Sequence, residues 1–165
     1  LYDRTFTING LSKSYSMTGW RLGYVACPDK PSADALQRLQ DQSTTGVTSF
    51  IQPGAVAALT GPQDCVAAMR AAFDERRAFL VQALNNIAGM HCLNPDGAFY
   101  LFPNVAAFGL PSDQLALRLL DEAHVAVVPG GSFGADDHIR ISFAASLAHL
   151  HEAVTRLTAW VAAHT

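Results

Sequence analysis

Short β-rich runs alternate with helical patterns along the chain, and this alternation most restricts the folds open to it. β-branched and aromatic residues gather in the runs expected to form strands, which lie within residues 4–8, 20–28, 92–105, 125–131 and 138–144. Apolar residues recur at helical spacing in the expected helices, which lie within residues 32–42, 50–62, 63–87, 112–123 and 147–163. Because strands and helices alternate rather than segregate, the sequence predicts an α/β fold.

Turn and capping residues indicate where three of these elements begin or end. Asn9-Gly10 is a turn signal, so the first strand is expected to end there. Arg21 is expected to open the second strand, and Ser32 to cap the helix that follows it.

The apolar pattern of residues 63–87 is the longest in the chain, with Val66 and Phe73 on one face and charged side chains on the other. A helix of this length is a natural bridge between two lobes. We therefore expect one domain over residues 1–62 and a second, which includes the long helix, over residues 63–165.

Composition excludes several kinds of partner. The formal net charge is −3 and only 15% of the residues are charged, so no basic surface for nucleic acid or anionic lipid is expected. No apolar run approaches the length of a membrane-spanning helix. Cys27, Cys65 and Cys92 lack metal-binding spacing and are interpreted as reduced core residues, and the acidic run 136–138 as a loop cap. We therefore expect a cytoplasmic protein without a metal site.

The lysine at position 13 stands in an unusual setting. It is one of only two lysines, the other being Lys30, and small hydroxyl residues surround it, with no charged neighbour nearer than Arg21. An amine in such a setting can act as a nucleophile and form a Schiff base with a carbonyl. Gly19 lets the chain reverse, so that Lys13 and the Arg21 guanidinium, which can grip a phosphate or carboxylate, could face one ligand. From the residues alone, a purely structural lysine remains the alternative.

Two further residues are candidates for a binding site. Arg140 is an isolated cation inside an alternating apolar strand, a costly position unless an anion meets it. The alternative is an arginine salt-bridged at a strand end. Gly97 lies in a turn before an aromatic strand, and a hairpin that simply needs glycine explains it equally well.

At this point the stretch "GLSKSYSMTGWRLG", residues 10–23, closely resembles the lysine motif of class I/II aminotransferases, the fold-type I pyridoxal-phosphate-dependent enzymes. The resemblance continues in the family's order through the segments "STTGVTSFIQPGAVAAL", "PDGAFYLFP", "VAVVPGGSFG" and "HIRISFA". Its details lean toward the aspartate/aromatic group. The resemblance implies the end of the large pyridoxal-phosphate-binding domain over residues 1–62, followed by the small C-terminal α/β domain over residues 63–165.

The resemblance also implies roles for single residues. Lys13 would form a Schiff base with pyridoxal 5'-phosphate, and Arg21 would bind the phosphate of this cofactor. Arg140 would bind the substrate's α-carboxylate, and Gly97 would approach the substrate. One position departs from the family, because a serine that often holds the phosphate is replaced here by Gly10.

The function implied is transamination between an L-amino acid and a 2-oxo acid by a ping-pong mechanism, in a homodimer. A β-lyase of the same fold, or an aminotransferase-like sensor domain of a transcription regulator, remains open as an alternative. The family's enzymes are more than twice as long as this chain. The 165 residues alone are therefore expected to show little transamination.

Overall fold

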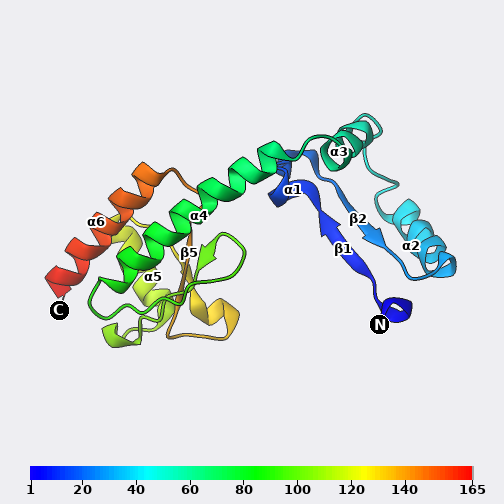
Figure 1. Ribbon diagram of the computed structural model, residues 1–165. Helices are drawn as coiled ribbons and strands as arrows, with labels where there is room; N and C mark the ends of the chain where they lie inside the picture. Colours follow the sequence, from blue (N-terminus) through cyan, green and yellow to red (C-terminus); the bar gives the residue numbers. More distant parts are fainter. Residues whose placement is uncertain (165) are drawn as a thin grey trace. The chain divides into compact units, whose positions relative to one another are not determined.

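The computed structural model describes residues 1–164 (Figure 1). The helices within this range are α1 (Leu11–Ser14), α2 (Lys30–Ser43), α3 (Ile51–Thr60), α4 (Asp64–Asn85), α5 (Ser112–Ala123) and α6 (Leu147–His164). The strands are β1 (Thr7–Gly10), β2 (Gly23–Ala26), β3 (Tyr100–Leu101), β4 (Val128–Pro129) and β5 (Ile139–Ser142). Short 3₁₀ turns are η1 (Tyr2–Arg4), η2 (Thr18–Trp20), η3 (Ala106–Phe108) and η4 (Gly130–Phe133). The predicted α/β class is confirmed.

The chain divides within α4 into two compact units, Leu1–Ala68 (unit 1) and Met69–Thr165 (unit 2). Each is described here by itself. The assignment of residues 1–62 and 63–165 to a large and a small domain stays a prediction.

Unit 1 is built on an antiparallel pair of strands, β1 and β2, whose register runs from Thr7 opposite Ala26 to Gly10 opposite Gly23. The turn predicted at Asn9-Gly10 is wrong, because both residues lie inside β1 and the chain reverses only through residues 11–22. Asn9 and Gly10 stay in the strand because they pair with β2, whose backbone approaches them closely. A Cβ atom on Gly23 would lie 2.8 Å from the backbone oxygen of Asn9.

Two helices follow the strands in unit 1. The predicted cap of α2 is corrected, since Asp29 rather than Ser32 is the N-cap and its carboxylate accepts a hydrogen bond from the Ser32 N–H at 2.8 Å. In α3, Gly54 lies against the indole ring of Trp20, where a Cβ atom would come within 2.6 Å of a ring carbon. This glycine therefore lets α3 approach the turn that precedes β2.

Unit 2 has a three-stranded antiparallel sheet with the order β3-β5-β4, so that β5 is central. Its core is one apolar cluster of side chains from α4, α5, α6 and the sheet. The fully buried members include Leu84, Leu115, Leu119, Ile139, Phe143 and Leu157. Helices α5 and α6 match the helices predicted over residues 112–123 and 147–163 to within one residue.

The cysteines only partly follow the expectation of core residues. Cys92 is buried, and burial raises the pKa of its thiol. Cys65 is exposed and Cys27 is half-buried, so the interpretation of Cys65 as a core residue is wrong. No helix within residues 1–164 is long and apolar enough to cross a membrane.

A polar contact joins the ends of α5 and α6. The carboxylate of Glu122 accepts hydrogen bonds from Arg118 Nε at 2.8 Å and from the indole N–H of Trp160 at 2.6 Å, and His164 Nε2 lies 3.2 Å away. The Arg118 guanidinium, helped by the indole, holds the pKa of the Glu122 carboxyl at about 2. Deprotonated Glu122 therefore stabilises the packing of α6 on α5.

This low pKa predicts acid-dependent stability of unit 2. The pKa of Glu122 is lower in the folded chain, about 2, than its ordinary 4.5, so its contribution is fully present above pH 4.5 and is lost as the pH falls toward 2. Glu122→Gln is expected to lower the free energy of unfolding at pH 7, and the difference from wild type should shrink over that interval. Urea unfolding followed by circular dichroism at several pH values measures it.

Glu152→Gln is the matched control, because Glu152 forms its ion pair with Arg156 of the same helix. Identical pH profiles for wild type and Glu122→Gln would contradict the assignment.

Candidate functional site

The lysine singled out in the sequence lies in the loop that joins β1 to β2. Lys13 is the third residue of α1, a single helical turn that begins directly after β1. The loop is anchored by Leu11, whose side chain is 1% exposed, and closed by a hydrogen bond from the Leu11 N–H to the Leu22 oxygen at 3.2 Å. The hairpin thus fixes the position of the backbone that carries Lys13.

The sequence suggested that Arg21 opens the second strand, and this prediction is wrong. Arg21 follows η2 in the left-handed region, with φ 53° and ψ 51°, and β2 begins two residues later. A residue other than glycine held there costs about 1–3 kcal/mol and is typical of functional sites. The guanidinium donates to the Thr18 backbone oxygen at 3.1 Å, and the Thr18 hydroxyl donates to the Ser12 oxygen at 2.9 Å. Thr18 therefore connects the lysine turn to Arg21.

This loop contains two basic residues and no acidic one. Between Arg4 and Asp29 the charged side chains are Lys13 and Arg21 alone. None of the ion pairs within residues 1–164 involves Arg21. A guanidinium held by strained backbone and free of carboxylates is suited to an anionic ligand such as a phosphate ester.

Arg140 lies in unit 2, in the centre of β5. Its neighbours Ile139 and Ile141 are buried in the core, and the Arg140 side chain is half-buried on the opposite face of the strand. Its guanidinium carbon lies 4.4 Å from the ring centre of Tyr100 and 4.8 Å from that of Phe133. The alternative of a salt-bridged strand-end arginine finds no carboxylate partner within residues 1–164.

Tyr100 and Phe133 were not singled out in the sequence. The sequence "FYLF" could have pointed to Tyr100, because alternate residues of a strand share a face, and Tyr100 and Phe102 are aromatic residues on the same face. Phe133 lies in η4, and no periodic pattern connects it to Arg140.

Gly97 lies in the turn before β3, and nothing in the described structure requires a glycine there. A Cβ atom at position 97 would meet nothing within 4 Å, and the positive φ of this turn belongs to Ala98, at 62°. Arg77 holds the turn by donating to the Pro95 oxygen at 2.7 Å. The hairpin explanation for Gly97 therefore loses support, while its role toward a substrate stays a prediction.

The four predicted site residues fall into two groups. Lys13 and Arg21 share one loop of unit 1, linked through Thr18, and Gly97 and Arg140 belong to unit 2.

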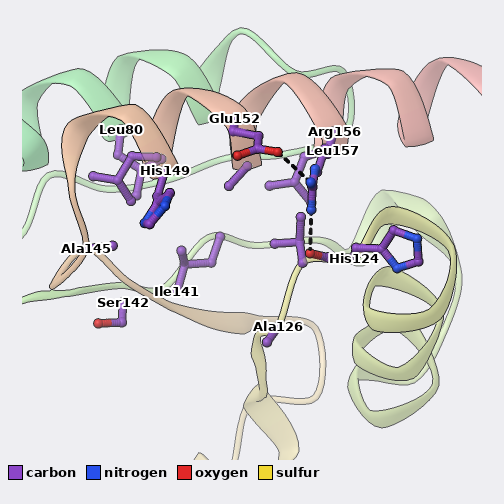
Figure 2. A pocket seen from close by; sticks show the side chains of 13 residues that line it. Leu80, His124, Ala126, Ile141, Ser142, Ala145, His149, Glu152, Arg156 and Leu157 are labelled. Atoms are coloured by element: carbon purple, nitrogen blue, oxygen red, sulfur yellow. Dashed lines mark hydrogen bonds and ion pairs between the residues drawn. The ribbon is translucent and has the colours of Figure 1, made fainter.

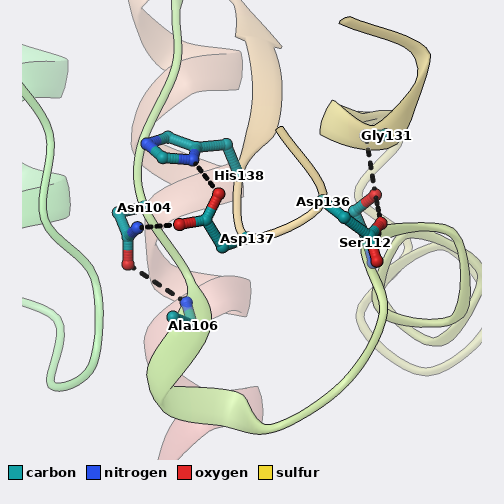
Figure 3. Close-up of polar contacts among 7 residues, drawn as sticks. All are labelled: Asn104, Ala106, Ser112, Gly131, Asp136, Asp137 and His138. Atoms are coloured by element: carbon teal, nitrogen blue, oxygen red, sulfur yellow. Dashed lines mark hydrogen bonds and ion pairs between the residues drawn. The ribbon is translucent and has the colours of Figure 1, made fainter. Parts of the chain in front are cut away.

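The acidic run after η4 organises loops. Asp136 accepts hydrogen bonds from the backbone N–H and the hydroxyl of Ser112, the first residue of α5, at 3.0 and 2.6 Å (Figure 3). The Ser112 hydroxyl oxygen in turn accepts from the Gly131 N–H at 3.0 Å. These bonds lower the pKa of Asp136. Asp137 bonds to Asn104 and to His138 in the same figure, and the His138 bond is the main reason its pKa is lowered.

A cavity of about 290 Å³ lies elsewhere in unit 2, and none of the four predicted residues lines it. Its apolar lining includes Leu80 and Ile141, and its rim carries His149 and an ion pair between Glu152 and Arg156 (Figure 2). The Arg156 guanidinium also donates to the His124 backbone oxygen at 3.2 Å, so this arginine already binds two groups of the chain itself.

Comparisons with known proteins agree with the fold and with the motif. The family described as aminotransferase class I and II matches residues 2–157, and the chain belongs to this family. A probable aspartate/prephenate aminotransferase of Aquifex aeolicus is 48% identical, over 93% of this chain and 40% of that protein. An aspartate aminotransferase of Geobacillus stearothermophilus is 47% identical, over 95% of this chain and 41% of that protein.

Solved structures give the same result. The aspartate aminotransferase of Rhizobium meliloti superposes with a TM-score of 0.94 at 40% identity, covering 98% of this chain and 43% of that one. The aromatic aminotransferase of Pyrococcus horikoshii gives 0.93 at 37% identity, with 98% and 44% covered. The chain thus spans about two fifths of the length of the relatives it matches.

The glycine pair that closes the lysine loop yields a stability prediction. Gly23→Ala would bring its Cβ atom to 2.8 Å from the Asn9 oxygen, whereas a Cβ atom at Gly10 would lie in ordinary contact, 3.6 Å from the Leu22 oxygen. Gly23→Ala is therefore expected to destabilise unit 1 by about 1–3 kcal/mol. Gly10→Ala is the matched control, and denaturant unfolding of both variants measures the difference. Equal effects of the two substitutions would contradict the close approach.

Proposed function

We propose that this chain is part of a pyridoxal-phosphate-dependent aminotransferase that exchanges an amino group between an L-amino acid and a 2-oxo acid. The observation that carries the proposal is the loop 11–22, which contains Lys13 in the turn after β1 and holds Arg21 in the left-handed region, hydrogen-bonded to the Thr18 backbone oxygen. Family membership supports the reaction class. The names of the relatives point to aspartate as one amino acid.

The residues present fit this cofactor. Arg21 has planar donors suited to a phosphate and makes no ion pair within residues 1–164. Lys13 would bond to the cofactor's aldehyde carbon, and Arg21 would hold its phosphate. Gly10 and Gly23, which pair at the end of the hairpin, leave backbone near the loop uncovered by side chains. When bound, pyridoxal phosphate supplies a carbonyl for amine exchange and a ring that takes up electron density from the substrate.

The chain's own residues would contribute two further actions. The Lys13 amine would accept the proton from the substrate Cα atom as a general base. Arg140 would bind the α-carboxylate through paired hydrogen bonds and so fix the direction of the Cα–H bond. Because Lys13 and Arg140 would serve the amino acid and the 2-oxo acid in turn, the whole protein would follow ping-pong kinetics.

The proposal extends to the assembly and the domains. Residues 1–62 would belong to the large cofactor-binding domain, and residues 63–165 would form the linking helix and the small domain. The whole protein would be a cytoplasmic homodimer. Gly97 would lie near the substrate.

Trapping with borohydride tests the role of Lys13 directly. The chain has only two lysines, and Lys30 is paired with Asp34 at 2.7 Å, so it provides an internal control. After incubation with pyridoxal phosphate and reduction, peptide mass spectrometry should find the adduct on Lys13. Lys13→Ala should abolish this adduct and Lys30→Ala should leave it unchanged. An adduct that survives in Lys13→Ala at the wild-type amount would overturn the proposal.

Arg21 gives a prediction in which affinity and stability separate. Arg21→Gly removes the phosphate ligand but suits the left-handed backbone, whereas Arg21→Ala removes the ligand and keeps the strain. Both variants should bind pyridoxal phosphate about 10- to 100-fold more weakly, the loss of a charged hydrogen bond. Arg21→Gly should unfold at a higher denaturant concentration than Arg21→Ala.

Equilibrium dialysis and urea unfolding measure these two quantities. Wild-type cofactor affinity in both variants would remove Arg21 from the phosphate site.

A further inference from the structure

The sheet of unit 2 has a second face, opposite the core, that carries aromatic side chains around one cation. Arg140 lies on this face, since Ile139 and Ile141 point into the core. Tyr100 pairs with Ser142 across β3 and β5, and paired residues of antiparallel strands share a face. Tyr100, Ser142 and Arg140 therefore lie on the same side of the sheet.

The rings around Arg140 support one another. Phe133, which lies 4.8 Å from the guanidinium carbon, meets Phe102 edge-on with ring centres 6.0 Å apart. Phe102 stacks on the imidazole of His138 at 4.9 Å, and Asp137 hydrogen-bonds that imidazole at 2.7 Å (Figure 3). Within residues 1–164 Phe133 and Tyr100 make no ring contact with each other, so each ring contacts the guanidinium separately.

Arg140 differs in this respect from the other anchored arginines of unit 2. Arg77, Arg118 and Arg156 each donate to carboxylate or backbone oxygens. Arg140 contacts two rings, and its guanidinium makes no hydrogen bond to any residue of the described chain. Stacking engages the flat faces of a guanidinium and leaves its in-plane N–H groups available for a planar acceptor.

We propose that Tyr100 and Phe133 are positioning residues that hold the Arg140 guanidinium plane and thereby set its affinity for the substrate carboxylate, with Phe102 supporting Phe133. This inference rests on the proposed function, in which Arg140 binds that carboxylate. The inference explains why Arg140 would bind the carboxylate tightly. A flexible arginine must be ordered when its ligand binds, whereas an arginine already in contact with two rings loses less conformational freedom.

The test uses the 165-residue chain and sodium pyruvate, a 2-oxo acid, as the probe. The Arg140 Nε–Hε signal in nitrogen–proton NMR spectra, assigned by its loss in Arg140→Lys, should move as pyruvate is added. Phe133→Leu and Tyr100→Leu should each raise the Kd read from this signal about 2- to 10-fold. Phe133→Tyr, which keeps the ring, should restore the wild-type Kd.

A second readout separates positioning from general damage. Relaxation of Arg140 Nε should show a more mobile guanidinium in the two leucine variants, while the backbone spectrum stays as in wild type. Methyl pyruvate, which lacks the carboxylate, should leave the signal in place.

Two results would overturn the inference: leucine variants that bind pyruvate with the wild-type Kd, or a wild-type Arg140 signal that pyruvate does not move. Borohydride trapping on Lys13 tests the proposed function independently. If trapping succeeds and the NMR test fails, only the positioning role of Tyr100 and Phe133 toward Arg140 is rejected.

Discussion

The alternation of side chains along β5 is the constraint on which unit 2 depends. Ile139 and Ile141 are buried on one face, so Arg140 must lie on the other. A shift of one residue would bury the guanidinium without a partner, at a cost of several kcal/mol. This penalty fixes the pairing of β3 and β4 with β5, and with it the position of Tyr100 beside Arg140.

Unit 1 depends on a different constraint, the close contact of backbone at the end of its hairpin. Gly23 has no room for a side chain, and the chain between Gly10 and Gly23 must reverse within twelve residues. That reversal holds Arg21 in the left-handed region. The strain is retained at a cationic residue whose charge no residue of the described chain neutralises, a combination that suits ligand binding better than stability.

The sequence predicted the long elements well and the turns poorly. Helices α5 and α6 follow from local apolar spacing, which needs no knowledge of distant residues. The Asn9-Gly10 prediction failed because both residues pair with the strand that begins at Gly23, thirteen residues beyond Gly10, and local turn propensity does not describe such pairing. Arg21 was placed in a strand for the same reason. Its backbone is set by the closure of a loop, and no propensity describes that.

For the site, the sequence identified the residue types but not how they are held. An arginine in an apolar strand suggested either an anion or a salt bridge, and the structure gives two aromatic rings instead. Rings stabilise a half-buried cation without using its N–H groups, whereas a carboxylate from the chain would occupy them. Arg140 is thus compatible with the fold and still able to bind an incoming carboxylate, a combination that a salt bridge within the chain would have prevented.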